Sequence, residues 1–236
     1  MKLYDELADW WPLISPPGDD YAKESAWVIH ALEAACAAPP RTVLELGSGG
    51  GNNAFYLKRH FELVLVDLSP RMLAVSRILN PEVEHLEGDM RTLRLGRELD
   101  AVFVHDSICY MTTREDLGAA MRTAAAHCRA GGACVFTPDF VRETFEPGHE
   151  MDGGDGERRA ARYCEWRHPA QGETYVVDYA FMLKEASGEV RVVHDRHVEG
   201  LFPRAVWLEL LRGAGLEPSI ERDEWGRDVF VGKKPG

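Results

Sequence analysis

The chain has little that would place it in a membrane, outside the cell or on nucleic acid. No run among its 236 residues approaches the roughly 20 consecutive apolar residues of a spanning helix. The N-terminus lacks the basic-then-apolar pattern of a secretory signal, so we expect a cytoplasmic protein with no membrane partner. Lys and Arg number 27 against 39 Asp and Glu, a net charge of −12. Because nucleic-acid binding needs clustered cations, we expect a small-molecule substrate and no nucleic-acid partner.

Cysteine is also scarce, and its spacing is uninformative. No two of the five cysteines form a C-x-x-C pair, and several lie in apolar segments (Cys36, Cys109, Cys128, Cys134 and Cys164). We therefore expect small buried side chains in a reducing compartment. The length suits one large α/β core without requiring a second. Nothing in the pattern favours a monomer over a homodimer.

The most informative segment is an apolar strand that runs into a glycine turn. Residues 42–46 favour a buried strand, and Gly47, Gly49 and Gly51 follow before an amphipathic helix. Glycine lets the backbone approach a ligand closely, and a helix N-terminus offers unpaired N–H groups. A second apolar strand ends at Asp67, where an acid could bind the hydroxyls of a ribose. The two segments together predict a site for an adenosine-like group.

The glycine spacing separates two candidate cofactors. A dinucleotide fingerprint would need its third glycine at position 52, which is Asn52. Instead, Glu45 lies two residues before Gly47, and an acid at that position suits a ligand that carries an ammonium group. The segment resembles the first motif of the class I S-adenosylmethionine (SAM) dependent methyltransferases. SAM is therefore the expected cofactor.

The next segments extend this resemblance in the same order. Ser69 and Pro70 are an N-cap and a first-turn proline, which would place Leu68 and Met72 against an adenine face. A third strand, 83–87, is followed by two further candidates for the cofactor site, Asp89 and Met90. The resemblance implies that Asp89 faces the adenine amino group.

The order of elements predicts an α/β fold of the doubly wound, Rossmann-like methyltransferase type. We expect a mostly parallel seven-stranded sheet with a C-terminal antiparallel strand, together with an antiparallel β lid inserted into it. The lid begins in our prediction with a polar loop at 148–157, which is rich in glycine and acids. Within a single domain, the expected parts are an N-terminal lid and helix, a SAM-binding core, the inserted substrate lid, and a C-terminal helix with a closing hairpin (1–40, 41–139, 140–200 and 201–236).

Four residues are candidates for a base or for orienting the acceptor. His105 and Asp106 follow the fourth strand at the edge where open α/β sheets bind ligands, Tyr110 lies just beyond, and His197 belongs to the lid. His105 is also expected to line the cofactor pocket. Two aromatic residues of the N-terminus, Tyr4 and Trp11, are candidates to cover the sulfonium, where cation–π attraction would contribute about 1–2 kcal/mol.

Two specialised sites are not expected. Asp106 and Asp139 have no third carboxylate to complete a metal site, so no metal is predicted. The segment after the fourth strand also lacks the (N/D)-P-P-(Y/F) tetrad of enzymes that methylate DNA bases or protein amides.

The two ends of the chain resemble bacterial amino-sugar N-methyltransferases. The resemblance rests on Tyr4-Asp5-x-x-Ala8 and on the tail that runs from His197 through Gly232. It implies methyl transfer from SAM to a small molecule, preferably at an amine nitrogen. Two alternatives stay open: an O-methyltransferase of a hydroxyl or carboxylate, and a SAM-binding partner or sensor without transferase activity.

Overall fold

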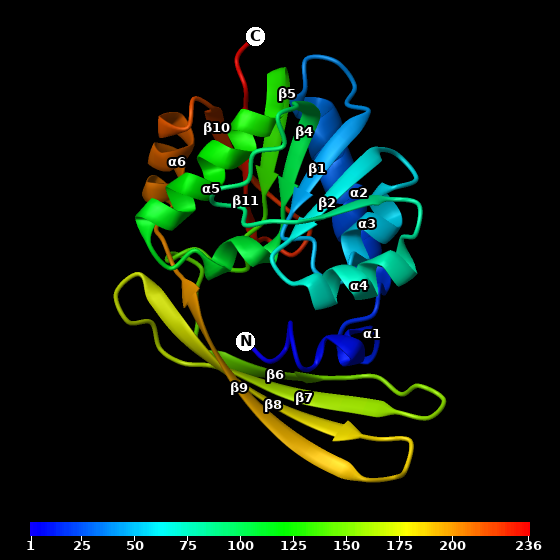
Figure 1. Ribbon diagram of the computed structural model, residues 1–236. Coiled ribbons are helices and arrows are strands. Elements are labelled where there is room, and N and C mark those ends of the chain that lie inside the picture. The colour runs from blue at the N-terminus through cyan, green and yellow to red at the C-terminus, as the bar shows by residue number, and fades with distance from the viewer.

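A computed structural model describes all residues, 1–236, and its centre is a seven-stranded sheet (Figure 1). The strand order is β10-β11-β5-β4-β1-β2-β3. Its strands are β1 (Thr42–Leu46), β2 (Glu62–Asp67), β3 (Glu84–Glu87), β4 (Leu99–Val104), β5 (Cys128–Phe136), β10 (Glu217–Arg222) and β11 (Asp228–Lys233). Strands β1 to β5 pair in parallel, whereas β11 runs antiparallel to both of its neighbours. The predicted sheet, with its one antiparallel strand, is confirmed.

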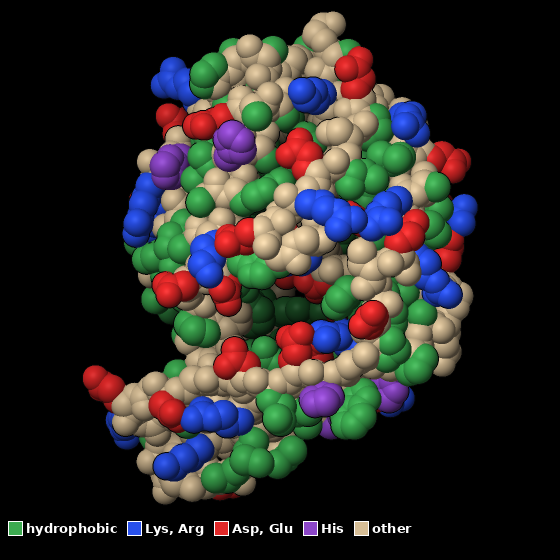
Figure 2. Space-filling view, turned by 180° about the vertical axis from the view of Figure 1, so that it is seen from behind, with side chains coloured by type: hydrophobic (Ala, Val, Ile, Leu, Met, Phe, Trp, Pro, Cys, Tyr) green, Lys and Arg blue, Asp and Glu red, His purple; other side chains and the backbone are tan.

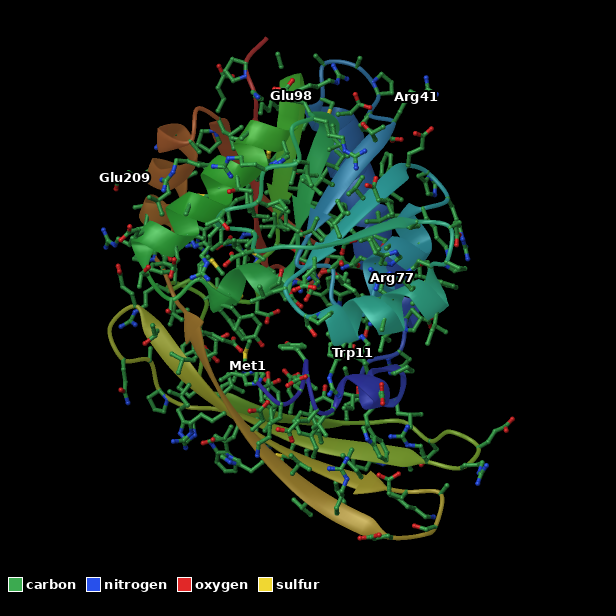
Figure 3. All side chains as sticks on the ribbon, viewed as in Figure 1. Met1, Trp11, Arg41, Arg77, Glu98 and Glu209 are labelled. Atoms are coloured by element: carbon green, nitrogen blue, oxygen red, sulfur yellow. The ribbon has the colours of Figure 1, made fainter.

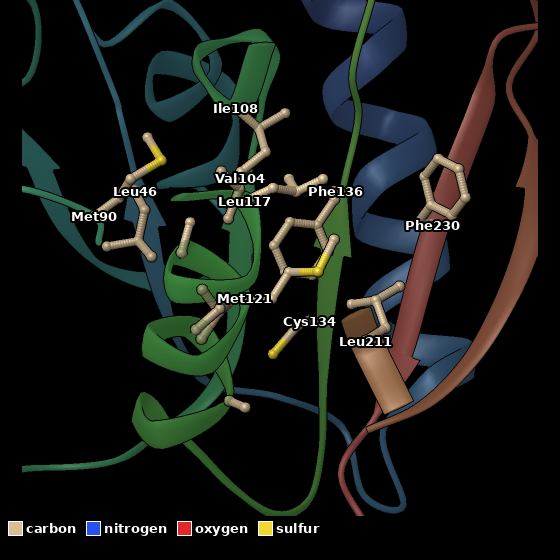
Figure 4. Close-up of a cluster of buried hydrophobic side chains, with 14 of the residues drawn as sticks. Leu46, Met90, Val104, Ile108, Leu117, Met121, Cys134, Phe136, Leu211 and Phe230 are labelled. Atoms are coloured by element: carbon tan, nitrogen blue, oxygen red, sulfur yellow. The ribbon is translucent and has the colours of Figure 1, made fainter. Parts of the chain in front are cut away.

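Helices cover both faces of this sheet. One face packs against α2 (Asp19–Ala35) and α3 (Asn52–Leu57), and the other against α5 (Arg114–His127) and α6 (Arg204–Gly213). Successive strand residues point to opposite faces, so Val43 joins one core cluster while Leu44 joins the other. Figure 4 shows the larger cluster, on the side of α5 and α6. Four of the five cysteines are buried, and all five are free thiols.

Two helices begin at side-chain caps, and the first of these is the predicted one. The Ser69 hydroxyl accepts the Met72 N–H at 3.1 Å at the start of α4 (Pro70–Leu79), and Pro70 occupies its first turn. The Thr113 hydroxyl accepts the Asp116 N–H at 3.1 Å at the start of α5. Such caps satisfy N–H groups that have no partner within the helix.

A second, antiparallel sheet is inserted between β5 and α6, as predicted. It contains β6 (Gly148–Asp152), β7 (Ala160–Arg167), β8 (Thr174–Lys184) and β9 (Val190–Gly200), in that order across the sheet. We call this sheet the lid, because it lies across from the carboxyl ends of the parallel strands (Figure 1).

The expectation of a loop over 148–157 is wrong for its first half, which is strand β6. Gly148 pairs with Arg167 and Asp152 with Tyr163, so backbone hydrogen bonds to β7 order a segment of low strand propensity. β6 is an edge strand, and charged residues are tolerated there because one side of the strand has no sheet neighbour.

The N-terminal segment forms a layer between the two sheets. It contains the 3₁₀ helix η1 (Ala8–Trp10) and α1 (Trp11–Ile14). Leu7 and Trp10 are buried and belong to the same apolar cluster as Phe181 of β8. Figure 3 shows Met1 and Trp11 within this layer. None of the helices has the length and apolar character needed to cross a bilayer.

Candidate functional site

A large hollow lies where the parallel sheet, the N-terminal segment and the lid meet. The cavity has a volume of about 780 Å³. Figure 2 shows it as a depression between the core and the lid, with acidic side chains around it. Open α/β sheets bind ligands at this carboxyl edge. The glycine turn and Asp67 line one part of the cavity, and the inner face of the lid lines another.

The glycine turn after β1 brings the backbone to the cavity wall. Gly47 has a φ of +75° and Gly49 a φ of +52°, a region that side-chain-bearing residues rarely adopt. A Cβ on Gly47 would lie 2.0 Å from the Ser107 hydroxyl. The turn is held in place because the N–H groups of Gly47 and Ser48 both donate to the Val66 carbonyl, at 2.7 and 3.0 Å.

Asp67, at the end of β2, is fixed by two backbone donors. Its carboxylate oxygens accept the Gly49 N–H and the Ser69 N–H, each at 2.8 Å. Burial raises the pKa of Asp67. Each oxygen keeps a further lone pair, and the residue lines the cavity. This arrangement can accept hydroxyl donors of a ribose.

Glu45 lies beside the same turn, and part of its carboxyl group has no partner. One of its carboxylate oxygens is buried without a hydrogen-bond partner, and burial raises the pKa of Glu45 to about 8. A buried carboxylate needs a cationic or donor partner. The ammonium group of SAM would meet that need, so the residues of this half fit the cofactor.

The residues expected around the adenine divide into two sets. Leu68, Asp89 and Met90 line the cavity. The Asp89 carboxylate accepts hydrogen bonds from Nε, Nη2 and the backbone N–H of Arg91, and these bonds lower its pKa. Met72, by contrast, is fully buried in the core and does not reach the cavity.

Gly51 also lies away from the cavity, where it serves packing. Its φ is +78°, and a Cβ there would lie 2.2 Å from the Ser76 hydroxyl of α4. The third glycine of the motif therefore allows α3 and α4 to approach each other rather than touching the ligand.

Tyr4 and Trp11 close the cofactor half from the N-terminal side. Both line the cavity, and their rings lie 5.9 Å apart between centroids. The Trp11 ring packs directly on Gly50, where a Cβ would lie 2.3 Å from its Cδ1 atom. The Tyr4 carbonyl accepts the Ser69 hydroxyl at 2.5 Å. The N-terminal segment is thus fastened over the glycine turn.

We expect this cover to close on the cofactor. S-adenosylhomocysteine should protect residues 1–20 and 145–165 from limited proteolysis. Gly50→Ala should expose residues 1–20 again and weaken cofactor binding about tenfold, since the new methyl group displaces Trp11. Gly213→Ala is the control, because a Cβ at Gly213 meets nothing within 4 Å. Equal cleavage with and without ligand would show that these segments are not a cover.

His105 and Asp106, at the end of β4, belong to a buried network of charges. His105 Nε2 lies 2.6 Å from a Glu24 oxygen and 3.2 Å from an Asp106 oxygen. Burial lowers the pKa of His105, but the carboxylates of Asp106 and Glu24 outweigh it and raise the pKa to about 9. Glu24 is also paired with Arg227. A protonated His105 is a poor base at neutral pH. Its contacts with Glu24 and Asp106 therefore favour a role in orienting the acceptor.

Tyr110 and His197 come together, although the sequence separates them widely. The Tyr110 hydroxyl lies 2.9 Å from His197 Nδ1 and 2.8 Å from the Tyr4 hydroxyl. Tyr110 lines the cavity, whereas His197 is buried behind it and is linked to the cavity by its hydrogen bond to Tyr110. Asp195, which bonds to His197 Nε2 at 3.0 Å, completes the group.

The lid supplies a set of site residues that the sequence reasoning missed. Its inner face presents aromatic and acidic side chains to the cavity (Tyr163, Glu165, Tyr175, Tyr179, Phe181 and Glu199). Glu199 accepts the Tyr175 hydroxyl, and burial raises the pKa of Glu199 to about 8. The sequence does contain a signal for these residues, because every second residue in 175–183 is apolar or aromatic. In a strand this pattern places Tyr175, Tyr179 and Phe181 on one face. Predicting which face points inward requires the structure.

No group of three or more His, Cys, Asp or Glu side chains is arranged to hold a metal ion. Several acidic residues in and beside the cavity instead form pairs with arginines. Arg167 contacts Glu150 and Glu165, and Arg227 contacts Glu24 and Asp223.

Comparison with known proteins gives a consistent result. Residues 43–132 match the family model described as a methyltransferase domain. The chain is 30% identical over 221 residues to the dTDP-3-amino-3,4,6-trideoxy-alpha-D-glucopyranose N,N-dimethyltransferase of Streptomyces venezuelae, covering 91% of this chain and 92% of that one. It is 28% identical to a dTDP-3-amino-3,6-dideoxy-alpha-D-glucopyranose N,N-dimethyltransferase of Streptomyces fradiae, covering 96% and 90%.

Solved structures agree with these sequence matches. DesVI of Streptomyces venezuelae superposes with a TM-score of 0.84 at 28% identity, covering 93% of both chains. The sugar N-methyltransferase KedS8 of Streptoalloteichus gives a TM-score of 0.84 at 29% identity, covering 93% and 90%. The chain belongs to the class I SAM-dependent methyltransferases. It is an enzyme of that family, and SAM is its cofactor.

Proposed function

We propose that this methyltransferase transfers the methyl group of SAM to the nitrogen of a small-molecule amine held beneath the lid. The observation that carries the proposal is the row of carboxylates in the acceptor half of the cavity. Asp106, Asp139, Glu165 and Glu199 all line it. An ammonium group would favour the ionised form of these carboxyls, including Glu199 with its raised pKa, whereas a carboxylate acceptor would gain no such partner.

The residues of the cofactor half support the proposal, because each could contact a different part of SAM. Asp67 would hold the ribose hydroxyls, and Glu45 the ammonium group of SAM. Leu68 and Met90 would lie against the adenine, with Asp89 at its edge. SAM supplies a methyl group already activated by the positive sulfonium. The protein's contribution is then to align the nitrogen with that methyl and to exclude water.

An amino group on a sugar ring is the acceptor that we favour. The relatives from Streptomyces carry names that describe N,N-dimethylation of dTDP-linked amino sugars, and the similarity extends over nearly the whole chain. The lid fits such a ring because Tyr175, Tyr179 and Phe181 offer apolar faces while Glu199 offers an acceptor for hydroxyl groups. A hydroxyl acceptor is the second candidate, favoured only by the number of carboxylates that could take up its proton.

The amine proposal predicts how the rate depends on pH. Only the neutral amine has a free lone pair, so kcat should rise with pH until the bound amine is deprotonated. The neighbouring carboxylates favour the ammonium form and should move this rise above the pKa of the amine in water. Release of S-adenosylhomocysteine, measured between about pH 6 and 10 with amino sugars and simple amines, checks the prediction.

Matched alcohols, in which a hydroxyl replaces the amino group, are the control. Turnover of the alcohols alone would replace the amine proposal by the second candidate. Tight binding of SAM without turnover of any acceptor would favour a SAM-binding sensor.

A further inference from the structure

A chain of four hydrogen-bonded side chains joins the lid, the core and the N-terminal segment. It runs from Asp195 through His197 and Tyr110 to Tyr4, with contacts of 3.0, 2.9 and 2.8 Å. Asp195 also accepts the Leu3 N–H at 2.9 Å. Asp195 and His197 are buried, whereas Tyr110 and Tyr4 line the cavity. The chain therefore has one end in the lid and the other at the site.

The direction of every hydrogen bond in this chain follows from the carboxylate of Asp195 at its buried end. A carboxylate only accepts hydrogen bonds, so His197 must carry its proton on Nε2, facing Asp195. Burial lowers the pKa of His197, so the ring is neutral and Nδ1 is an acceptor. Tyr110 then has to donate to Nδ1. Because the single hydroxyl proton of Tyr110 is used in that bond, its oxygen accepts the proton of Tyr4.

We propose that Asp195 and His197 are positioning residues that make Tyr4 present a hydrogen-bond acceptor, and no donor, to the acceptor amine. This inference rests on the proposed function. A lone pair on the Tyr4 oxygen accepts an N–H of the neutral amine, which turns the nitrogen's own lone pair toward the methyl group. As the N–C bond forms and the S–C bond breaks, sulfur keeps the bonding pair and the nitrogen becomes positive. The same acceptor stabilises that charge, and the proton leaves with the product ammonium.

Protonation of His197 would reverse the whole chain. Nδ1 would then donate to Tyr110, Tyr110 to Tyr4, and the proton of Tyr4 would point at the amine. The groups that face His197 are Asp195 of β9, Tyr110, Tyr4, and Tyr179 of β8, whose ring centroid lies 4.8 Å away. The N-terminal amino group adds a further charge that disfavours protonation. Asp195 favours the protonated ring, but burial outweighs it, so the ring is neutral, and the chain is in its acceptor state, near pH 7.

Variants of His197 test the proposal, because they should change kcat without changing the dissociation constant of SAM. His197→Phe removes the acceptor, so Tyr110 donates to Tyr4 instead, and kcat should fall about tenfold to 100-fold. His197→Asn places an amide oxygen near Nδ1 and should restore most of that loss. The dissociation constant of SAM should change less than about twofold in both variants, because position 197 is buried behind Tyr110 and does not line the cavity. His194→Gln, on the exposed face of the same strand, is the control and should behave as the wild type.

The pH dependence gives a second readout that a purely structural role would not change. Below the pKa of His197, kcat of the wild type should fall more steeply than kcat of His197→Asn, since the wild type then loses both the neutral amine and the acceptor state. Thermal unfolding of each variant shows whether a low rate reflects poor folding. His197→Asn with normal stability and a rate as low as His197→Phe would overturn the proposal.

Nitrogen NMR of histidine-labelled protein with bound S-adenosylhomocysteine shows which ring nitrogen of His197 carries the proton. It therefore determines the direction of the hydrogen bonds without any turnover. The expected result is a neutral His197 with its proton on Nε2. A proton on Nδ1 would overturn the inference, because His197 would then donate to Tyr110. Wild-type activity on amines with an unimpaired His197→Phe would overturn the inference alone. A wild type that methylates no amine would overturn the proposed function as well, so the two failures are distinguishable.

Discussion

Asp67→Ala should weaken SAM binding by roughly 1.5–3 kcal/mol, which is about tenfold to 150-fold in the dissociation constant. The variant loses charge-assisted hydrogen bonds to the ribose hydroxyls. It also leaves the N–H groups of Gly49 and Ser69 without the acceptor that fixes the turn. Titration calorimetry measures the effect directly.

Glu62→Ala is the matched control for Asp67→Ala. Glu62 is the first residue of the same strand, β2, and is exposed at the end far from the cavity. It should bind SAM as the wild type does. An unchanged affinity in Asp67→Ala, with the same heat of binding, would remove Asp67 from the cofactor site.

Gly47→Ala should lower both the stability of the protein and its affinity for SAM. The left-handed conformation costs about 1–2 kcal/mol for alanine, and the crowded site adds about 1–3 kcal/mol. The new Cβ would lie 2.0 Å from the Ser107 hydroxyl and 2.8 Å from Met90 Cε. The turn must shift, so we expect SAM affinity to fall more than about 100-fold along with the loss of stability.

Gly96→Ala separates the two causes. Gly96 has a similar φ of +68°, but a Cβ there meets nothing within 4 Å. In Gly96→Ala the free energy of unfolding should therefore fall only by the cost of the left-handed conformation, and SAM binding should be unchanged. Urea unfolding and calorimetry on both variants give the comparison. Equal losses in the two variants would show that crowding at the turn has no consequence.

Most of the central sheet could be predicted because its signals are local. β1 has the bounds that the sequence indicates, and β2 ends at Asp67 as expected. β5, however, begins at Cys128 and continues through Gly131-Gly132, a pair of residues typical of a turn. The two glycines that suggested a break instead form an irregularity, where the register with β4 shifts between Leu99 and Ala101. Backbone pairing overrides the local preference there, as it does in β6.

The two halves of the cavity differ in how much the sequence reveals. The half with the glycine turn is formed by residues next to their own strand ends, so a motif and a spacing are sufficient to predict Glu45 and Asp67, both of which line the cavity. The acceptor half depends on contacts between residues far apart in the chain. Asp195 bonds to the Leu3 amide across 192 positions, and Arg227 contacts Glu24 across 203. No pattern of neighbouring residues encodes such pairs, so Asp195 and Glu24 were missed.

The lid is encoded by one uninterrupted stretch of chain, between the end of β5 and the start of α6. Its strands hydrogen-bond to one another and to no strand of the central sheet. A chimaera that exchanges this stretch alone would leave the glycine turn and Asp67 unaltered while replacing the wall that contacts the acceptor. Such an exchange should change which acceptor is methylated and leave the SAM-binding residues unchanged. The graft would have to retain Asp195 and His197, since the orientation of Tyr110 and Tyr4 in the host depends on them.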